Sequence, residues 1–246
     1  MMVDFGLPVG QVAEVLAMAG DYIDLGKIAV GTARLYDLSY LRRKLALYRR
    51  HRIRAFIGGQ FMEYVYAVHG KPMLERFLSE AKRVGFDVVE ISDNCVPLTR
   101  RERMAQIRLA RRCGLSVFGE VGSKDTKSDS RRLVGQAQDC FEAGAELVLI
   151  EAAELIERGR PKMKLINDIR RGLDMAKVLI ELPGPWISDV TLSAVEDMKK
   201  FLVREFGPDI NLANVMPSDI METEALRVGL GVVGPDLKLN RLPRGA

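Results

Sequence analysis

Short apolar runs rich in β-branched residues alternate along this chain with longer amphipathic segments. The runs have the length of buried strands, and we expect eight, near residues 1–4, 22–30, 53–57, 86–92, 115–120, 146–151, 177–181 and 209–214. The segments between them carry apolar residues at helical spacing, near residues 9–19, 37–50, 72–84, 99–113, 128–143, 163–174, 187–206 and 217–229. This alternation of strand and helix is typical of an α/β protein with a parallel sheet.

Four of the predicted strands end on a glutamate at nearly constant intervals. Glu90, Glu120, Glu151 and Glu181 are separated by 30, 31 and 30 residues, and Asn211 follows after another 30. Eight strand–helix units of about 30 residues predict a (β/α)8 TIM barrel. The alternative is an open doubly wound sheet, which usually has fewer strands and a point where the strand order reverses.

The composition agrees with a single globular domain over residues 1–246. Hydrophobic residues make up 48% of the chain and charged residues 28%, and no linker or low-complexity tract divides it. No apolar run reaches the ~18–20 residues of a membrane-spanning helix, and the first residues lack a signal-peptide pattern. We therefore expect a cytoplasmic protein with no membrane partner. Three cysteines without a C-x-x-C pair argue against a disulfide framework or a zinc site.

The chain has 37 lysines and arginines against 33 acidic residues, a formal net charge of +4. The two densest basic segments, residues 42–54 and 100–112, have the pattern of amphipathic helices, and the second opens with a capping box at Thr99 and Glu102. Neither interleaves its arginines with a stacking platform of aromatics. We therefore expect no nucleic-acid partner. The apolar residues around Trp186 fit either a lid or the interface of a homo-oligomer, and the sequence leaves the oligomeric state open.

Acidic residues gather at the predicted carboxyl ends of the strands, the end of a TIM barrel that carries the active site. Each single carboxylate has the alternative of being a solvated loop residue or a helix cap. Neighbouring carboxylates in register, however, repel one another unless they hold protons or share a cation. Oxygen ligands without histidine favour Mg²⁺ or Mn²⁺ over zinc. Our candidate metal ligands are Glu90, Asp93, Glu120 and Glu151.

Two lysines at the same end are candidates for proton transfer. Lys27 lies inside an apolar strand, where an unpaired ammonium is costly, so it either forms an ion pair with a glutamate or acts as an electrostatic group or acid. Lys124, just after the fifth predicted strand, is either an ordinary loop lysine or the proton donor, and we assign it the second role. Glu181 completes the predicted catalytic set. Neither His51 nor His69 ends a predicted strand.

Residues for substrate binding are expected at the same edge. Gly58 and Gly59 follow the third predicted strand, where their backbone N–H groups could approach an anion. Gln60 follows directly, and Asn214 ends the last predicted strand. We assign all four to substrate binding.

Seven stretches of the chain match the pattern of a known family: DFGLP (4–8), GDYIDLGKIAVGT (20–32), GGQFMEY (58–64), GFDVVEISD (85–93), EVGSK (120–124), NLANVMPSD (211–219) and EALRVGL (224–230). By these stretches the chain resembles the phosphosulfolactate synthase family, TIM-barrel enzymes of coenzyme M biosynthesis. The resemblance implies small anionic substrates, phosphoenolpyruvate and sulfite, with Mg²⁺ as cofactor. Sulfite attacks the methylene carbon, Mg²⁺ stabilises the charge that develops on the carboxylate, and a lysine protonates the neighbouring carbon.

The chain departs from the family pattern at three cationic positions. Phe5 stands where the family has a lysine, and Ala153 and Gly231 stand where it has arginines. Because arginines clamp phosphate and sulfonate groups, two further hypotheses stay open. One is a divergent enzyme with a less anionic acceptor or a different nucleophile, and the other is a non-catalytic, stress-protective barrel like the family's plant relatives. The arginines that would compensate are Arg34, Arg158, Arg160 and Arg227, of which we assign Arg227 to substrate binding.

Overall fold

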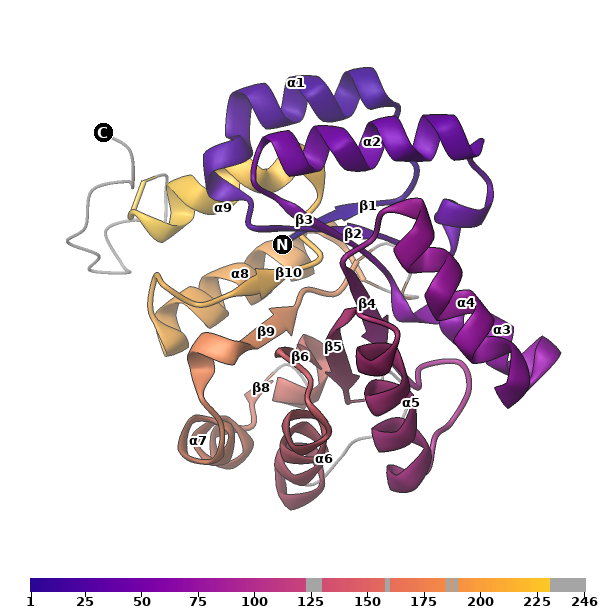
Figure 1. Cartoon of the computed structure of the whole chain (residues 1–246). Coiled ribbons are helices and arrows are strands. Elements are labelled where there is room, and N and C mark those ends of the chain that lie inside the picture. The colour runs from indigo at the N-terminus through magenta and orange to yellow at the C-terminus, as the bar shows by residue number, and fades with distance from the viewer. Residues whose placement is uncertain (123–129, 158–159, 185–186, 188–189, 231–246) are drawn as a thin grey trace.

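Eight parallel strands follow one another around a barrel in chain order (Figure 1). The computed structural model describes residues 1–122, 130–157, 160–184, 187 and 190–230. The barrel strands are β1 (Met2–Asp4), β2 (Leu25–Ile28), β3 (Arg54–Ile57), β4 (Val88–Ile91), β5 (Ser116–Val121), β6 (Leu147–Glu151), β9 (Val178–Glu181) and β10 (Leu212–Ala213). A parallel bridge between Met2 and Val215 brings the last strand back to the first. The predicted TIM barrel is confirmed.

Helices surround the barrel on the outside (Figure 1). In the described part of the chain they are α1 (Val9–Ala19), α2 (Leu38–Arg50), α3 (Gly59–His69), α4 (Lys71–Val84), α5 (Arg100–Arg112), α6 (Ser130–Ala143), α7 (Met163–Gly172), α8 (Leu192–Phe206) and α9 (Ile220–Arg227). Short 3₁₀ turns are η1 (Gly20–Tyr22), η2 (Thr32–Arg34), η3 (Ala152–Leu155), η4 (Met175–Lys177) and η5 (Pro217–Asp219). None of the described helices combines the length and apolar character needed to cross a membrane.

Two elements differ from the sequence expectation. Helix α3 begins directly after β3, in a stretch with no predicted element, because its glycine, aromatic and β-branched residues form helices weakly on their own. A two-stranded hairpin, β7 (Ile156–Glu157) with β8 (Arg160–Pro161), follows the sixth barrel strand. The capping box of α5 is confirmed: Thr99 accepts from the Glu102 N–H, and Glu102 accepts from the Thr99 N–H.

The barrel interior is filled by one apolar side chain from nearly every strand. This inner cluster consists of Leu25, Phe56, Val88, Phe118, Leu149, Leu179 and Ala213. Side chains alternate between the two faces of a strand, so the residue two positions further on also points inward. Six strands thereby direct these residues toward the barrel axis at their carboxyl ends: Lys27, Gly58, Glu90, Glu120, Glu151 and Glu181.

A buried ion pair fastens helix α2 to the end of β1. The Lys44 ammonium is fully buried and lies 2.7 Å from Asp4 Oδ2, 2.9 Å from the Tyr36 hydroxyl and 2.7 Å from the Leu7 carbonyl. Asp4 also accepts from the Tyr48 hydroxyl over 2.8 Å. This network fixes the turn after β1, which carries Phe5.

We expect Lys44→Met to lower the free energy of unfolding by about 3 kcal/mol, because it leaves the Asp4 carboxylate buried without its cation. Urea titration followed by circular dichroism measures this change. Lys82→Met is the matched control, since Lys82 pairs with Asp87 at the surface over 3.1 Å and its loss should cost less than about 1 kcal/mol. Equal effects of the two substitutions would contradict a special role for the buried pair.

Candidate active site

A cavity of about 240 Å³ lies at the carboxyl end of the barrel. Its polar residues include Lys27, Glu90, Glu120 and Glu181, which end four different strands, together with Gln60. Most of the remaining wall consists of residues that follow the strands: Phe5, Ala29, Val30, Gly58, Gly59, Asn94 and Asn214. The cavity is therefore built on the inward-facing ends of the strands, and it has room for a small organic acid.

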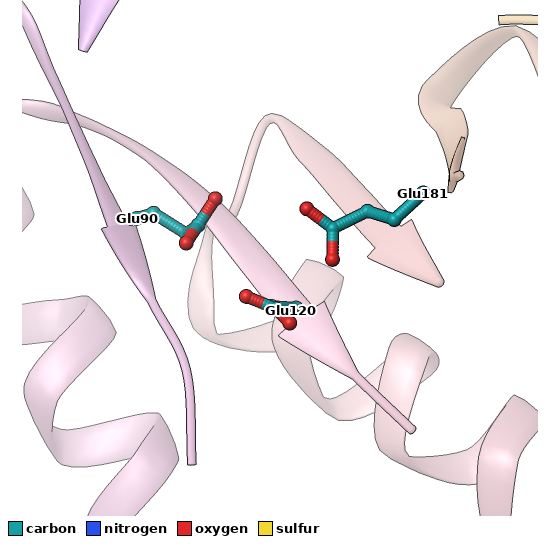
Figure 2. A group of neighbouring side chains, drawn as sticks. All are labelled: Glu90, Glu120 and Glu181. Atoms are coloured by element: carbon teal, nitrogen blue, oxygen red, sulfur yellow. The ribbon is translucent and has the colours of Figure 1, made fainter. Parts of the chain in front are cut away.

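Lys27 lies among three buried carboxylates. Its Nζ is 2.9 Å from Glu90 Oε2, 2.9 Å from Glu181 Oε1 and 3.9 Å from Glu120 Oε2. One oxygen from each glutamate lies within 4.8 Å of the others, and Figure 2 shows the three carboxylates directed toward a common centre. The expected pairing of Lys27 with a glutamate is thus present, with more than one partner.

The charges of this cluster do not balance. One ammonium faces three carboxylates, which leaves an excess of two negative charges when all four groups are ionised. Burial raises the pKa of Glu90 and of Glu120, and burial followed by the Glu120 charge raises the pKa of Glu181 to about 7. Burial alone would lower the pKa of Lys27, but the glutamate charges raise it well above 10.5. The cluster therefore holds a proton or takes up a further cation.

Two hydrogen bonds orient the carboxylates from outside the cluster. The Gly59 N–H, at the start of α3, donates to Glu90 Oε1 over 2.8 Å. Asn94 Nδ2 donates to Glu120 Oε1 over 2.5 Å. The Gly58 N–H instead donates to the Ile28 carbonyl over 3.0 Å. In this structure the N–H groups that we expected to approach an anion already have protein acceptors, and that of Gly59 holds a carboxylate.

Within the described part of the chain, Glu90, Glu120 and Glu181 form a group that could hold a metal ion. They offer three carboxylate groups on rigid strands, and their shared negative charge is the kind that a hard divalent cation neutralises. The donor set therefore fits Mg²⁺ or Mn²⁺. Glu181, which we expected to act in catalysis, lies in the same group as the two expected ligands.

The other two expected metal ligands lie outside this group. Asp93 forms an ion pair with the buried guanidinium of Arg103 on α5. Glu151 is buried on β6, in register with Glu181 on β9. Asp93 comes two residues after β4 ends, where strand alternation no longer decides which way a side chain points, and so the structure separates it from the cluster.

Of the expected substrate-binding residues, Gln60 and Asn214 line the cavity and Arg227 does not. Arg227 is in the last turn of α9 and donates to the Pro208 carbonyl over 2.7 Å. Helices of this barrel run antiparallel to its strands, so the last turn of a helix lies at the amino ends of the strands, opposite the cavity. Lys124 and Gly231 lie outside the described residues.

Two residues on the cavity wall have unusual backbone conformations. Val30 has φ of 47°, which β-branched residues rarely adopt, and Asn214 has φ of 59°, in the left-handed region that asparagine tolerates better than most residues. Among the described residues, Asn214 Oδ1 is buried and receives no hydrogen bond. Backbone strain concentrates at functional sites, so both observations support the choice of this cavity. Val30 and Asn94 were not predicted as site residues: Val30 falls within the predicted strand 22–30, and nothing in the local sequence distinguishes Asn94 from an ordinary loop residue.

The fold and the site together define the class of protein to which this chain belongs. A TIM barrel with a charged cavity at the carboxyl ends of its strands has the architecture of a TIM-barrel enzyme. The model of the family described as (2R)-phospho-3-sulfolactate synthase (ComA) matches residues 1–232. The chain belongs to this family, and it is therefore an enzyme of the lyase or synthase type.

Individual relatives agree with this assignment. The phosphosulfolactate synthase of Methanocaldococcus jannaschii is 29% identical over 241 residues, which are 94% of this chain and 90% of the relative. An Arabidopsis thaliana protein named HEAT-STRESS-ASSOCIATED 32 is 22% identical over 240 residues, 87% of this chain and 79% of the relative. Among solved structures, a 3-hexulose-6-phosphate synthase superposes with a TM-score of 0.52 at 15% identity, over 94% of this chain and 99% of the other. The last similarity supports the fold alone.

We expect the stability of the metal-free protein to fall as the pH rises from about 5 to about 8. The folded protein keeps a proton on Glu181 up to about pH 7, whereas the unfolded chain loses it near the ordinary value of 4.5. The free energy of unfolding should therefore decrease by up to about 1.4 kcal/mol for each pH unit between these two values. Urea titrations at several pH values measure the slope.

Glu181→Gln should make this pH dependence shallower, because the amide does not titrate. The exposed Glu222 offers a matched control, and Glu222→Gln should leave the slope unchanged. A stability that increases over the same pH range in the wild-type protein would show that Glu181 is not protonated in the folded state.

Proposed function

We propose that this enzyme adds sulfite to phosphoenolpyruvate in the presence of Mg²⁺, forming phosphosulfolactate for coenzyme M biosynthesis. The observation that carries the proposal is the cluster of three buried carboxylates around Lys27 at the base of the cavity. Membership of the synthase family supports the reaction, and the excess negative charge of the carboxylate cluster supports the binding of a divalent cation there. In the addition, a carbon–sulfur bond forms at the methylene carbon, the carbon–carbon double bond becomes single, and the neighbouring carbon takes up a proton.

Glu90, Glu120 and Glu181 are the proposed Mg²⁺ ligands. Bound there, the ion would supply Lewis acidity toward the carboxylate oxygens of the acceptor. The chain's own contribution is orientation: the strands hold the three glutamates, while Gly59 and Asn94 fix the carboxylates of Glu90 and Glu120 by hydrogen bonds.

Lys27 is proposed as a fixed positive charge and not as the proton donor. Its ammonium is held at 2.9 Å by two carboxylates, a geometry that keeps the proton on nitrogen. We propose Lys124 as the group that protonates the carbon, and Gln60 and Asn214 as groups that bind the substrate. The unpartnered Asn214 oxygen, buried in the cavity wall, supports the assignment of Asn214.

A second candidate function is the addition of a nucleophile to a less anionic acceptor. Phe5 favours it, because this aromatic side chain lines the cavity, and Lys27 is the one cationic side chain among its described lining residues. Two polyanions would gain little attraction from a lysine that three carboxylates already neutralise. Both candidate functions use the same barrel and the same carboxylate cluster.

Incubation with phosphoenolpyruvate, sulfite and Mg²⁺ should yield phosphosulfolactate, detected by mass spectrometry. A chelator should abolish the activity and Mg²⁺ should restore it. Glu120→Gln and Lys27→Met should each reduce kcat/KM at least about 100-fold, since each removes a charge from the site. Lys82→Met, at the surface, is the control. Folded wild-type protein that forms no product would contradict the proposed reaction.

Phe5→Lys distinguishes the two candidates. A lysine at this position adds a positive charge to the cavity wall, and we expect it to lower the KM for phosphoenolpyruvate about 10-fold. Phe5→Leu, which changes the wall without adding charge, is the matched control. If the wild-type enzyme turns over a less anionic acceptor and Phe5→Lys impairs that reaction, the second candidate is favoured.

A further inference from the structure

Glu63, on helix α3, receives three hydrogen bonds from the loop that follows β4. The residue is 4% exposed and does not line the cavity. Its Oε1 accepts from the Ser92 hydroxyl, and its Oε2 accepts from the N–H groups of Cys95 over 2.6 Å and Val96 over 2.8 Å. One buried carboxylate thus fixes both ends of the segment from Ser92 to Val96.

Glu63 and Gly59 lie four residues apart on α3 and so face the same side of the helix. Ser92 lies against both. A Cβ atom on Gly59 would lie 2.8 Å from Ser92 Cβ and closer still to its hydroxyl, which means that only glycine allows this approach. The start of α3 and the loop after β4 are therefore packed together as one unit, with Glu63 as the hydrogen-bond acceptor at its centre.

This unit carries the two hydrogen bonds that orient the carboxylates. The Gly59 N–H on the helix side donates to Glu90, and Asn94 in the middle of the loop donates to Glu120. If the loop were released from Glu63, the Asp93–Arg103 ion pair would still hold the residue next to Asn94, but Asn94 would lose the anchors on both sides of it at Ser92 and Cys95, and Gly59 would lose the neighbour against which it packs. Two of the three carboxylates in the cluster depend on this junction.

We propose that Glu63 is a positioning residue that sets the affinity of the carboxylate cluster for a divalent cation, acting through the Ser92–Val96 loop and Asn94. The inference rests on the proposed function in one respect, that Glu90, Glu120 and Glu181 bind the cation. Hydrogen-bond partners of metal-binding carboxylates typically change metal affinity by 10- to 100-fold when they are removed.

The proposed role depends on the hydrogen bonds that Glu63 accepts and not on its charge. Two substitutions separate the effect of the hydrogen bonds from that of the charge. In Glu63→Gln the amide oxygen still accepts from the Cys95 and Val96 N–H groups, and the Ser92 hydroxyl turns to accept from the amide nitrogen. In Glu63→Ala all three contacts are lost. The glutamine variant should therefore preserve the loop that the alanine variant releases.

The experiment titrates Mn²⁺ into folded, metal-free protein and follows the free ion by electron paramagnetic resonance. We expect Glu63→Ala and Asn94→Ala each to weaken Mn²⁺ binding about 10-fold. The double variant should bind Mn²⁺ no more weakly than the single variant with the lower affinity, because Glu63 acts through Asn94 and the two effects are not additive. Glu63→Gln should stay within about 3-fold of the wild type. Asn94→Ala keeps the test valid if Glu63→Ala does not fold.

Glu102→Ala is the matched control. Glu102 also accepts hydrogen bonds between α3 and the start of α5, from Tyr66 and Thr99, and pairs with Lys71, and none of these partners belongs to the Ser92–Val96 loop. We expect this variant to be less stable and to bind Mn²⁺ as the wild type does. An equal loss of affinity in Glu102→Ala, or in Glu63→Gln, would overturn the proposal.

A measurement without metal separates this inference from the proposed function. Amide hydrogen exchange at Gly59 should be at least about 10-fold faster in Glu63→Ala than in the wild type and unchanged in Glu102→Ala. Unchanged exchange at Gly59 would overturn the positioning role whatever the protein binds. Wild-type protein that binds no Mn²⁺, with Gly59 exchange altered as expected, would instead refute the metal site.

Discussion

The structure of this site depends on the compensation of buried negative charge. Three glutamates at the carboxyl ends of β4, β5 and β9 face one lysine from β2, and the barrel keeps water from screening them. An ionised carboxylate buried without a counter-charge is costly, so the group takes up a proton or a cation. Three features reduce the cost of this buried charge. The pKa of Glu181 is raised, the Gly59 N–H at the start of α3 donates to Glu90, and Asn94 in the loop after β4 donates to Glu120.

The sequence predicted the part of this arrangement that follows from periodicity. A repeat of about 30 residues fixes the strands of a TIM barrel, and alternation along each strand then fixes which side chains point inward. Glu90, Glu120 and Glu181 stand two residues after Val88, Phe118 and Leu179 of the inner core, so their inward direction follows from those two regularities. Glu151 obeys the same rule after Leu149 but does not join the group of three, so the regularities alone do not select its members. The rule ends with the strand. Beyond β4, Asp93 turns to Arg103, while Asn94 turns to the cluster.

Contacts between elements account for what the sequence did not predict. In helix α3, Gly59 packs on Ser92 and Glu63 accepts hydrogen bonds from the loop after β4, and local periodicity predicts neither contact. Arg227 is a different case. The running direction of the helices in a barrel puts the last turn of α9 at the amino ends of the strands, so topology alone would have placed it away from the cavity.

The same charge balance constrains what the enzyme can bind. With a divalent cation added, the excess of two negative charges in the cluster is cancelled, which removes the repulsion against one anionic group but provides no surplus attraction for several. Phe5 contributes no charge to the described wall. The described part of the wall therefore supplies no positive charge beyond Lys27 for a polyanionic substrate. If the three glutamates bind the proposed cation, its affinity depends on the hydrogen bonds from Gly59 and Asn94 that orient two of them.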